Sequence, residues 1–161
     1  MSIIRQPEEV EDFNEMVAMM GSIALFDKIA TVQLRLIAAH MKIVYLKKEE
    51  RLFSEGGKSD CMYFVVSGTL DVLKLSEKKK WVSVASLSRG RTIGEMAILD
   101  AFPRSASVVA RTPSTLLSFT REGFEYILEH HPRAGISFLK GIARVLSLHL
   151  RRASGQLADF S

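Results

Sequence analysis

The sequence predicts an α+β domain in which helices at both ends of the chain enclose a sandwich or barrel-like roll of about seven or eight short strands. Apolar residues follow a helical spacing over about the first 40 residues and again after Thr120. Between these parts lie runs of about four to eight residues rich in Val, Tyr, Phe or Leu, separated by Gly, Ser, Pro, Lys or Asp. Because 161 residues is the size of one domain, we expect a single fold with a sizeable core.

The N-terminal segment, residues 1–21, is predicted to be helical. A helix over residues 8–20 would carry acidic residues in its first turn, where they favour helix formation. Further apolar residues after Gly21 indicate helical turns that are interrupted near Asp27. The first of these helices has an apolar face formed by Val10, Phe13, Val17 and Met20.

The strands of the roll are predicted to lie between about residues 42 and 119. The lysine run at residues 78–80 marks a solvated hairpin tip. The single cysteine, Cys61, cannot form an internal disulfide, so we expect a buried, inert thiol in a reducing compartment. The runs that predict strands are 42–48, 51–55, 61–68, 69–76, 80–87, 105–111 and 115–120.

Two helices are predicted after the roll, at about residues 121–154. Pro132 ends the first and begins the second, since the missing N–H of proline costs nothing in a first turn. The second helix has two apolar stripes, so we expect one to pack on the roll and the other to form a parallel homodimer seam. The alternative is one wide apolar face that covers the core. The stripes are Phe138, Ile142, Val145, His149 and, beside them, Ile136, Leu139, Ala143, Leu146, Leu150, Ala153, Leu157.

Composition excludes several classes of protein. The chain has 22 basic and 18 acidic residues, a modest excess that only weakly favours a nucleic-acid surface. No window approaches the roughly 18 apolar residues of a membrane span, and acids stand where a signal peptide needs an apolar core. We therefore expect a cytoplasmic protein without a membrane partner. Whether the chain is a fragment of a longer protein stays open, although Met1 and the tail at 158–161 look natural.

Residues 93–110, IGEMAILDAFPRSASVVA, place an acid and an arginine between a glycine turn and a strand. Gly94 permits a close backbone approach. Glu95, when ionised, only accepts hydrogen bonds, so its natural ligand partner is a pair of hydroxyls such as a ribose edge. Arg104 has a planar fork suited to a phosphate, and Ser105 adds a hydroxyl beside it. Together these groups are typical of a site for the sugar and phosphate of a nucleotide.

Free amides at Met96 and Ala97 would add donors for an anion if this segment makes a helical turn. The residues alone leave a second interpretation open. Glu95 and Arg104 could pair with each other across a surface loop, which is worth at most about 1 kcal/mol.

The stretch GEMAILDAFPRSASVVA resembles the phosphate-binding cassette of cyclic nucleotide-binding domains, in which G-E-x-A-L and P-R-x-A-x-V-x-A flank a spacer. LFSEGGKSDCMYFVVSGTLDVL and VASLSRGRTIGE are similar to further parts of this family, and the helices after Thr120 to its hinge and lid helices. The resemblance covers about residues 22–157. It implies an eight-stranded antiparallel, jelly-roll-like β-roll flanked by N-terminal helices and two C-terminal helices. The implied ligand is cAMP or cGMP, as in the effector domain of catabolite activator protein.

The resemblance also implies roles for individual residues. Glu95 would accept from the ribose 2′-hydroxyl, Arg104 would pair with the cyclic phosphate, and Ser105 would lie beside that phosphate. The other implied ligand-binding positions are Gly94, the amides of Met96, Ala97 and Ala106, the apolar Val72 and Val84 against base and sugar, and His149 with Leu150 on the lid helix.

Three departures from the family pattern are visible. Lys48-Glu49 replaces a turn glycine, so we expect a turn of another shape, and Ile93 replaces an aromatic residue. Only about eight residues follow Ala153, too few for the winged helix-turn-helix of catabolite activator protein. We therefore expect no direct DNA binding.

The predicted function is a stand-alone cyclic-nucleotide sensor or regulatory subunit. Ligand binding would favour one position of the C-terminal helices and so change the surface offered to an effector protein or to the other protomer. Ser105 does not distinguish the two nucleotides; we favour cAMP because cAMP domains are common in soluble stand-alone form. The alternative is a nucleotide-independent protein-interaction module on the same fold.

No enzyme activity, metal site or cofactor is expected beside the nucleotide ligand. The sequence offers no Ser-His-Asp or Cys-His arrangement for catalysis. A jelly-roll metal enzyme needs converging ligands on strands, whereas the histidines lie in predicted helices. They are His40, His130, His131 and His149.

Overall fold

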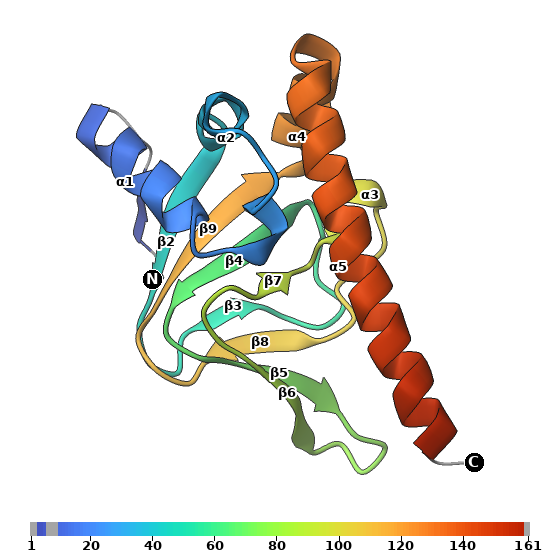
Figure 1. Ribbon diagram of the computed structural model, residues 1–161. Coiled ribbons are helices and arrows are strands. Elements are labelled where there is room, and N and C mark those ends of the chain that lie inside the picture. The colour runs from blue at the N-terminus through green and yellow to red at the C-terminus, as the bar shows by residue number, and fades with distance from the viewer. Residues whose placement is uncertain (1–2, 6–9, 160–161) are drawn as a thin grey trace.

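The computed structural model describes residues 3–5 and 10–159 of the chain. Nine strands within these residues form two antiparallel sheets, with the orders β1-β2-β9-β4-β7 and β3-β8-β5-β6 (Figure 1). Strands β2 to β9 form the predicted eight-stranded roll, which is confirmed, and β1 adds to its edge. The strands are β1 (Ile3–Arg5), β2 (Met41–Leu46), β3 (Arg51–Phe53), β4 (Cys61–Ser67), β5 (Leu70–Leu75), β6 (Trp81–Leu87), β7 (Thr92–Ile93), β8 (Ser107–Ala110) and β9 (Ser114–Thr120).

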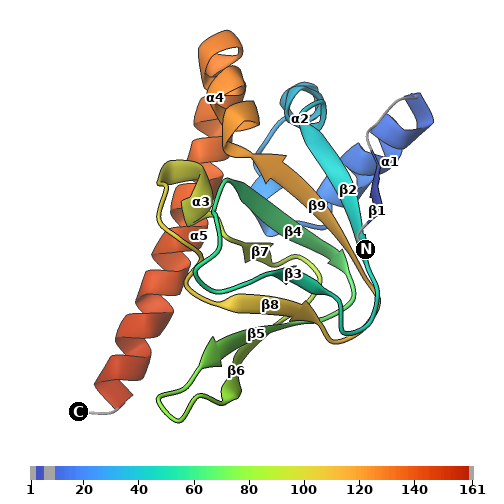
Figure 2. The same cartoon turned by 180° about the vertical axis from the view of Figure 1, so that it is seen from behind.

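Helices precede and follow the roll, as predicted for an α+β domain. The last two helices meet at a single residue, His131, and Pro132 begins the second, as the sequence indicates. Figures 1 and 2 show this second helix running along the side of the roll, with its C-terminal end standing apart from the roll beside the β5–β6 hairpin. No helix in the described part of the chain is both long and apolar enough to cross a membrane. The helices are α1 (Val10–Met20), the 3-10 turn η1 (Ala24–Phe26), α2 (Thr31–Ala38), α3 (Met96–Leu99), α4 (Arg121–His130) and α5 (Pro132–Asp159).

The prediction that about the first 40 residues are helical was wrong for Ile3–Arg5, which form β1. This strand pairs with the edge of β2, where Ile4 lies opposite Val44. The short β7 was not predicted either, although it pairs with β4 in the same sheet. Both strands have three residues or fewer, so neither is long enough to produce a periodic signal. The expected start of the first helix, at residues 8–9, lies outside the described residues.

The five-stranded sheet is buried on both faces. Ile43, Phe64 and Leu117 belong to the core beneath the helices, whereas their neighbours along each strand belong to the core between the two sheets. A strand buried on both faces reads as a continuous apolar run, which is the pattern of CMYFVV in β4. The neighbours are Val44, Val65 and Leu116.

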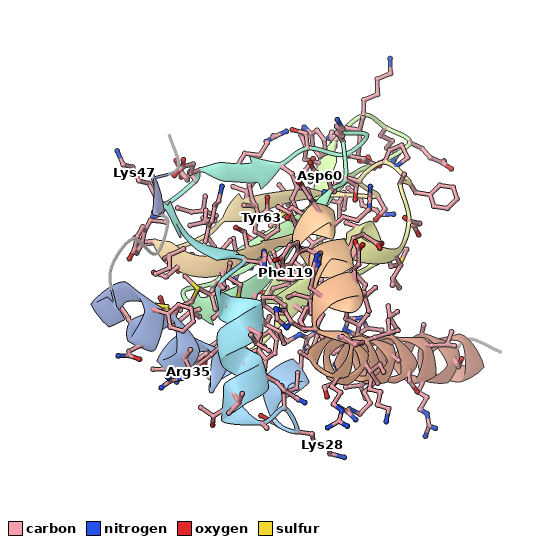
Figure 3. All side chains as sticks on the ribbon, turned by 90° about the horizontal axis from the view of Figure 1, so that it is seen from above. Lys28, Arg35, Lys47, Asp60, Tyr63 and Phe119 are labelled. Carbon is pink, nitrogen blue, oxygen red and sulfur yellow. The ribbon has the colours of Figure 1, made fainter. Side chains whose placement is uncertain are left out.

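Aromatic side chains anchor α5 to this sheet. Phe138 is fully buried, and its ring centroid lies 5.0 Å from that of Phe119 on β9. Figure 3 shows Phe119 between the sheet and the surrounding helices. Ile142, one helical turn further along α5, is also fully buried. The stripe of Phe138 and Ile142 therefore packs on the core, as one of the two predicted stripes was expected to do.

The turn between β2 and β3 differs from the expectation. We expected another shape because Glu49 stands where the family has glycine. Instead, Glu49 adopts a φ of 70°, the left-handed region that glycine favours. Its amide donates to the Ala110 carbonyl at 2.7 Å, which joins the turn to the end of β8. The tertiary contact thus preserves a glycine-like backbone at a non-glycine residue.

Candidate functional site

A cleft of about 260 Å³ opens beside α3 and under α5, close to the lower end of the roughly 300–1,000 Å³ typical of small-molecule sites. It brings together most of the sequence-predicted site residues, including both anchors of the cassette. Of the predicted ligand-binding residues, those that line the cleft are Gly94, Glu95, Met96, Ala97, Arg104, Ser105, Ala106, Val72 and His149.

Two predicted contacts do not line the cleft. Val84 is 54% exposed and lies on the edge strand β6. The pairing of β5 with β6 skips this residue, because Val72 lies opposite Ala85 and Leu73 opposite Ser83. Such a bulge re-aims the side chains around it, and the position that the family resemblance assigned to Val84 is not part of the cleft lining. Leu150 on α5 is also outside the cleft lining and is 69% exposed.

Arg104 is a buried cation that has no carboxylate within ion-pair distance among the described residues, although the charge of Asp60 favours it at longer range. One terminal nitrogen donates to the Cys61 carbonyl at 2.6 Å, while its buried Nε has no hydrogen-bond partner. Its guanidinium carbon lies 4.1 Å from the centroid of the Phe53 ring, in a cation–π contact. Burial lowers the pKa of the guanidinium from its ordinary value. A buried cation with an unused donor is poised for an anion.

The backbone of Arg104 is held by a glycine loop that follows β3. Its amide donates to the Gly57 carbonyl at 2.9 Å, and its carbonyl accepts from the Gly56 amide at 2.8 Å. Beyond it, the buried hydroxyl of Ser107 accepts from the Glu55 amide at 2.9 Å. The EGG sequence at residues 55–57 thus places the arginine at the cleft.

Gly94 leaves the space that the guanidinium occupies. A Cβ atom at this position would lie 2.3 Å from an Arg104 terminal nitrogen, and the φ of Gly94 is 71°. Both the close approach and the left-handed backbone therefore require glycine here. This is the physical reason for the glycine that precedes the glutamate in the cassette.

Glu95 pairs with α5 and not with Arg104. Its Oε1 lies 3.1 Å from Nδ1 of His149 on α5, and Glu95 is buried. Among the ion pairs of the described residues there is none between Glu95 and Arg104, so the interpretation as a surface ion pair was wrong. The sequence could not reveal the His149 contact, because the two residues are 54 positions apart.

The backbone amides of the cassette differ from the expectation at one position. The Ala97 amide donates to the Gly94 carbonyl at 2.9 Å within the tight turn, so it is already used. The amides of Met96 and Ala106 have no acceptor in the described part of the chain. Among the described residues, the predicted anion donors that remain are thus those two amides, the Ser105 hydroxyl and the Arg104 guanidinium.

Tyr63 and Cys61 on β4 both lie next to the Arg104 guanidinium. Burial raises the pKa of the Cys61 thiol and of the Tyr63 hydroxyl above their ordinary values. Both groups are therefore neutral at physiological pH, and neither neutralises the cation. Figure 3 shows Tyr63 and Asp60 near the start of α4.

The histidines do not converge on a metal site. Two were predicted in helices but lie outside them: His40 is in the turn after α2, and His131 links α4 to α5. Within the described residues no group of three or more His, Cys, Asp or Glu side chains could hold a metal ion. The His130 ring instead stacks on Tyr126, with centroids 4.0 Å apart.

The comparison with known protein families matches the part of the chain that contains the cassette. A model of the cyclic nucleotide-binding domain family matches residues 43–131, from β2 to the end of α4, more than half of the chain. The chain belongs to this family.

Curated relatives contain the domain within longer chains. The cAMP-dependent protein kinase regulatory subunit of Aspergillus niger is 30% identical over 118 residues, 73% of this chain and 26% of that protein. Glutaminase 2 of Bradyrhizobium diazoefficiens is 27% identical over 138 residues, 86% of this chain and 21% of that protein. The chain thus spans about a fifth to a quarter of the length of these relatives.

Solved structures share the arrangement of the whole domain. A cyclic nucleotide-binding domain from Methylobacillus flagellatus superposes with a TM-score of 0.80 at 24% identity, covering 94% of this chain and 85% of that one. The catabolite activator protein of Thermus thermophilus gives a TM-score of 0.74 at 26% identity, covering 85% of this chain and 62% of that one.

Several residues of this cyclic nucleotide-binding domain were missed by the sequence reasoning. Phe53 supports the Arg104 guanidinium from β3. Phe102 lines the cleft although 71% of it is exposed, and Leu87, at the end of β6, lines the cleft where Val84 does not. Each is an ordinary apolar residue in the sequence, so only the fold reveals its position. Pro103 of the quoted cassette also lines the cleft, and the other unpredicted lining residues are Ser59, Thr92, Ile93, Asp100 and Val108.

Proposed function

We propose that the domain binds a cyclic mononucleotide, cAMP in preference to cGMP, and acts as a signalling sensor or regulatory subunit through movement of α4 and α5. The observation that carries this proposal is Arg104, a buried guanidinium that lines the cleft with an unused donor and without a carboxylate. A cyclic phosphate supplies the negative charge and the acceptor oxygens that this group lacks. The domain itself needs no catalytic group for this role.

Glu95 supports the ribose part of the proposal. Its carboxylate can accept from a sugar 2′-hydroxyl, and one of its oxygens contacts Nδ1 of His149. A ribose that takes this oxygen competes with His149 and so releases or shifts the lid helix. Such competition gives the two positions of α5 different affinities for ligand, which a ligand-driven shift requires.

The preference for cAMP rests on a relative and not on the cleft. The Aspergillus niger protein, at 30% identity, is named as a cAMP-dependent kinase regulatory subunit. The hydroxyl of Ser105 is compatible with either base, and the base side of the cleft is apolar at Val72 and Leu87. The proposed preference of this domain for cAMP is therefore taken from the name of that relative.

Calorimetric titration with four ligands tests the proposal. We expect the order cAMP, then cGMP, with 2′-deoxy-cAMP at least about tenfold weaker than cAMP because Glu95 loses its hydroxyl partner. A cyclic dinucleotide should not bind. If none of the four ligands binds at millimolar concentration, the proposal is refuted.

An exposed apolar surface favours a second candidate, a nucleotide-independent interaction module. On α5, Ile136, Leu139 and Leu150 are 50%, 39% and 69% exposed. A stripe of this kind marks a contact with another protein. Absence of binding in the titration, with the fold intact by circular dichroism, would favour this function.

The same stripe supports our proposal of a parallel homodimer through α5. Replacing Leu150 with lysine should raise the dimer dissociation constant at least about tenfold, because an unpaired ammonium would be buried in an apolar seam. Leu148→Lys is the matched control, since Leu148 is 48% exposed on the same helix but lies on another face. Light scattering should give twice the 18.0 kDa chain mass for the wild type and the control. A wild-type mass equal to one chain would contradict the seam.

A further inference from the structure

Arg121, the first residue of α4, joins this helix to the phosphate-binding cassette. Its backbone amide donates to the Asp60 carbonyl at 2.9 Å. Its side chain crosses to α3, where Nε donates to the Ala97 carbonyl at 2.9 Å and a terminal nitrogen also contacts the Asp100 carbonyl. The same nitrogen donates to the Ser59 carbonyl at 2.7 Å. One half-buried guanidinium thus binds three carbonyls from two segments that are distant in the sequence, Ser59 and residues 97–100.

These contacts hold the C-terminal end of α3, where Ala97 and the following Asp100 also line the cleft. The helix has four residues, Met96–Leu99, and a helix this short leaves its last carbonyls without internal donors. The Arg121 guanidinium supplies donors there, and its charge is favourable at a helix C-terminus. The other end of α3, with Glu95 and Met96, lines the cleft.

The same arginine therefore determines where the cassette lies relative to α4. Helix α4 continues into α5 through the single residue His131, and α5 returns to the cleft at His149. Two side-chain contacts join the cassette to the C-terminal helices. One is the hydrogen bond of Arg121, at the start of α4, and the other is the contact of Glu95 with His149 on α5. A ribose that engages Glu95 competes with the contact to His149 but not with the hydrogen bonds of Arg121.

We propose that Arg121 is a positioning residue that passes a shift of the cassette to α4, an inference that rests on the proposed nucleotide binding. Arg111 shows the contrast. It is an exposed arginine whose guanidinium pairs with Asp71 on the surface, away from the cleft lining. Arg121 has three main-chain carbonyls as partners, so these contacts depend on where the backbone of the cassette lies and not on its side chains.

Two variants separate positioning from simple helix stability. Arg121→Ala removes the carbonyl contacts. Thr120→Ala removes the side-chain cap that accepts from the Gly123 amide at 3.0 Å, which weakens the same helix without contacting α3. Arg121→Lys is the conservative variant, because an ammonium retains the charge but lacks the planar fork.

Hydrogen exchange followed by mass spectrometry, with and without cAMP, is the measurement. In ligand-free Arg121→Ala, exchange over residues 96–102 should rise about tenfold, whereas Thr120→Ala should leave it near the wild-type rate. With cAMP, Arg121→Ala should bind about tenfold more weakly and lose most of the ligand-dependent change in α4. Arg121→Lys should fall between these values.

The proposal is overturned if exchange at 96–102 is unchanged in Arg121→Ala, or if Thr120→Ala reproduces the whole effect. A wild-type domain that binds no cyclic nucleotide would refute the proposed function. The ligand-free exchange would still decide whether Arg121 positions the cassette, so the two failures are distinguishable.

Discussion

Arg104→Leu is expected to abolish cyclic-nucleotide binding without destabilising the ligand-free domain. The guanidinium would supply at least two hydrogen bonds to the phosphate, and each bond to a charged group is worth about 1.5–3 kcal/mol. Their loss corresponds to an affinity decrease of at least about 100-fold in the calorimetric titration.

The stability part of this prediction follows from the burial of an unpaired cation. In the ligand-free domain Arg104 is 7% exposed and its Nε has no partner, so the folded chain holds a charge that water would solvate better. Burial lowers its pKa, which means that the charged form is less favourable in the folded state at every pH below that pKa. Leucine removes this cost but also the Cys61 contact. We therefore expect a melting temperature equal to or above that of the wild type.

Two controls make the result specific. Arg104→Lys keeps the charge without the fork, and it should bind about tenfold more weakly than the wild type. Arg111→Leu removes an exposed arginine that pairs with Asp71, so it should leave nucleotide affinity unchanged. If Arg104→Leu binds the nucleotide as tightly as the wild type, Arg104 is not part of the binding site. A clear fall in the melting temperature of this variant would contradict the argument from burial.

The anchors of the site could be predicted because their chemistry is local in the sequence. Gly94 and Glu95 stand next to each other, and Arg104 follows nine residues after Glu95 in a segment whose pattern resembles a known cassette. The structure adds the reason for the glycine, since its missing side chain leaves room for the arginine. The roll was likewise predictable from its longer strands, because buried strands produce apolar runs.

What could not be predicted depends on contacts between distant segments. Val84, which the family resemblance assigned to the ligand, lies outside the cleft lining next to a bulge, which shifts the strand pairing by one residue and is invisible in an apolar run. The partners of Arg121 lie 21, 24 and 62 residues away from it. In the sequence, Arg121 is only a basic residue at the start of a helix. A regular spacing therefore reveals which face of an element is apolar but not what its polar residues contact.

Phe138→Ala is expected to cause the largest loss of stability among these variants, about 3–5 kcal/mol. The Phe138 ring is fully buried, within 5.7 Å of the rings of Phe26, Phe119 and Phe124. Close packing continues one turn on at Gly141, where a Cβ atom would lie 2.7 Å from the Leu25 carbonyl. The neighbouring structure cannot collapse into the space of a lost ring without moving α5. Urea denaturation should show a lower midpoint with an unchanged slope.

Leu139→Ala is the matched control, because Leu139 follows Phe138 on α5 but is 39% exposed. Its loss should cost less than about 1 kcal/mol. Helix α5 therefore consists of an anchored first half, at Phe138 and Ile142, and a second half that reaches the cleft through His149 while Leu148 and Leu150 remain exposed. Movement of the lid is then expected beyond the anchor, so cAMP should change hydrogen exchange in the second half of α5 and not at residues 136–142. A ligand-dependent change of equal size in both halves would show that α5 moves as one rigid body and that Phe138 is not a fixed point.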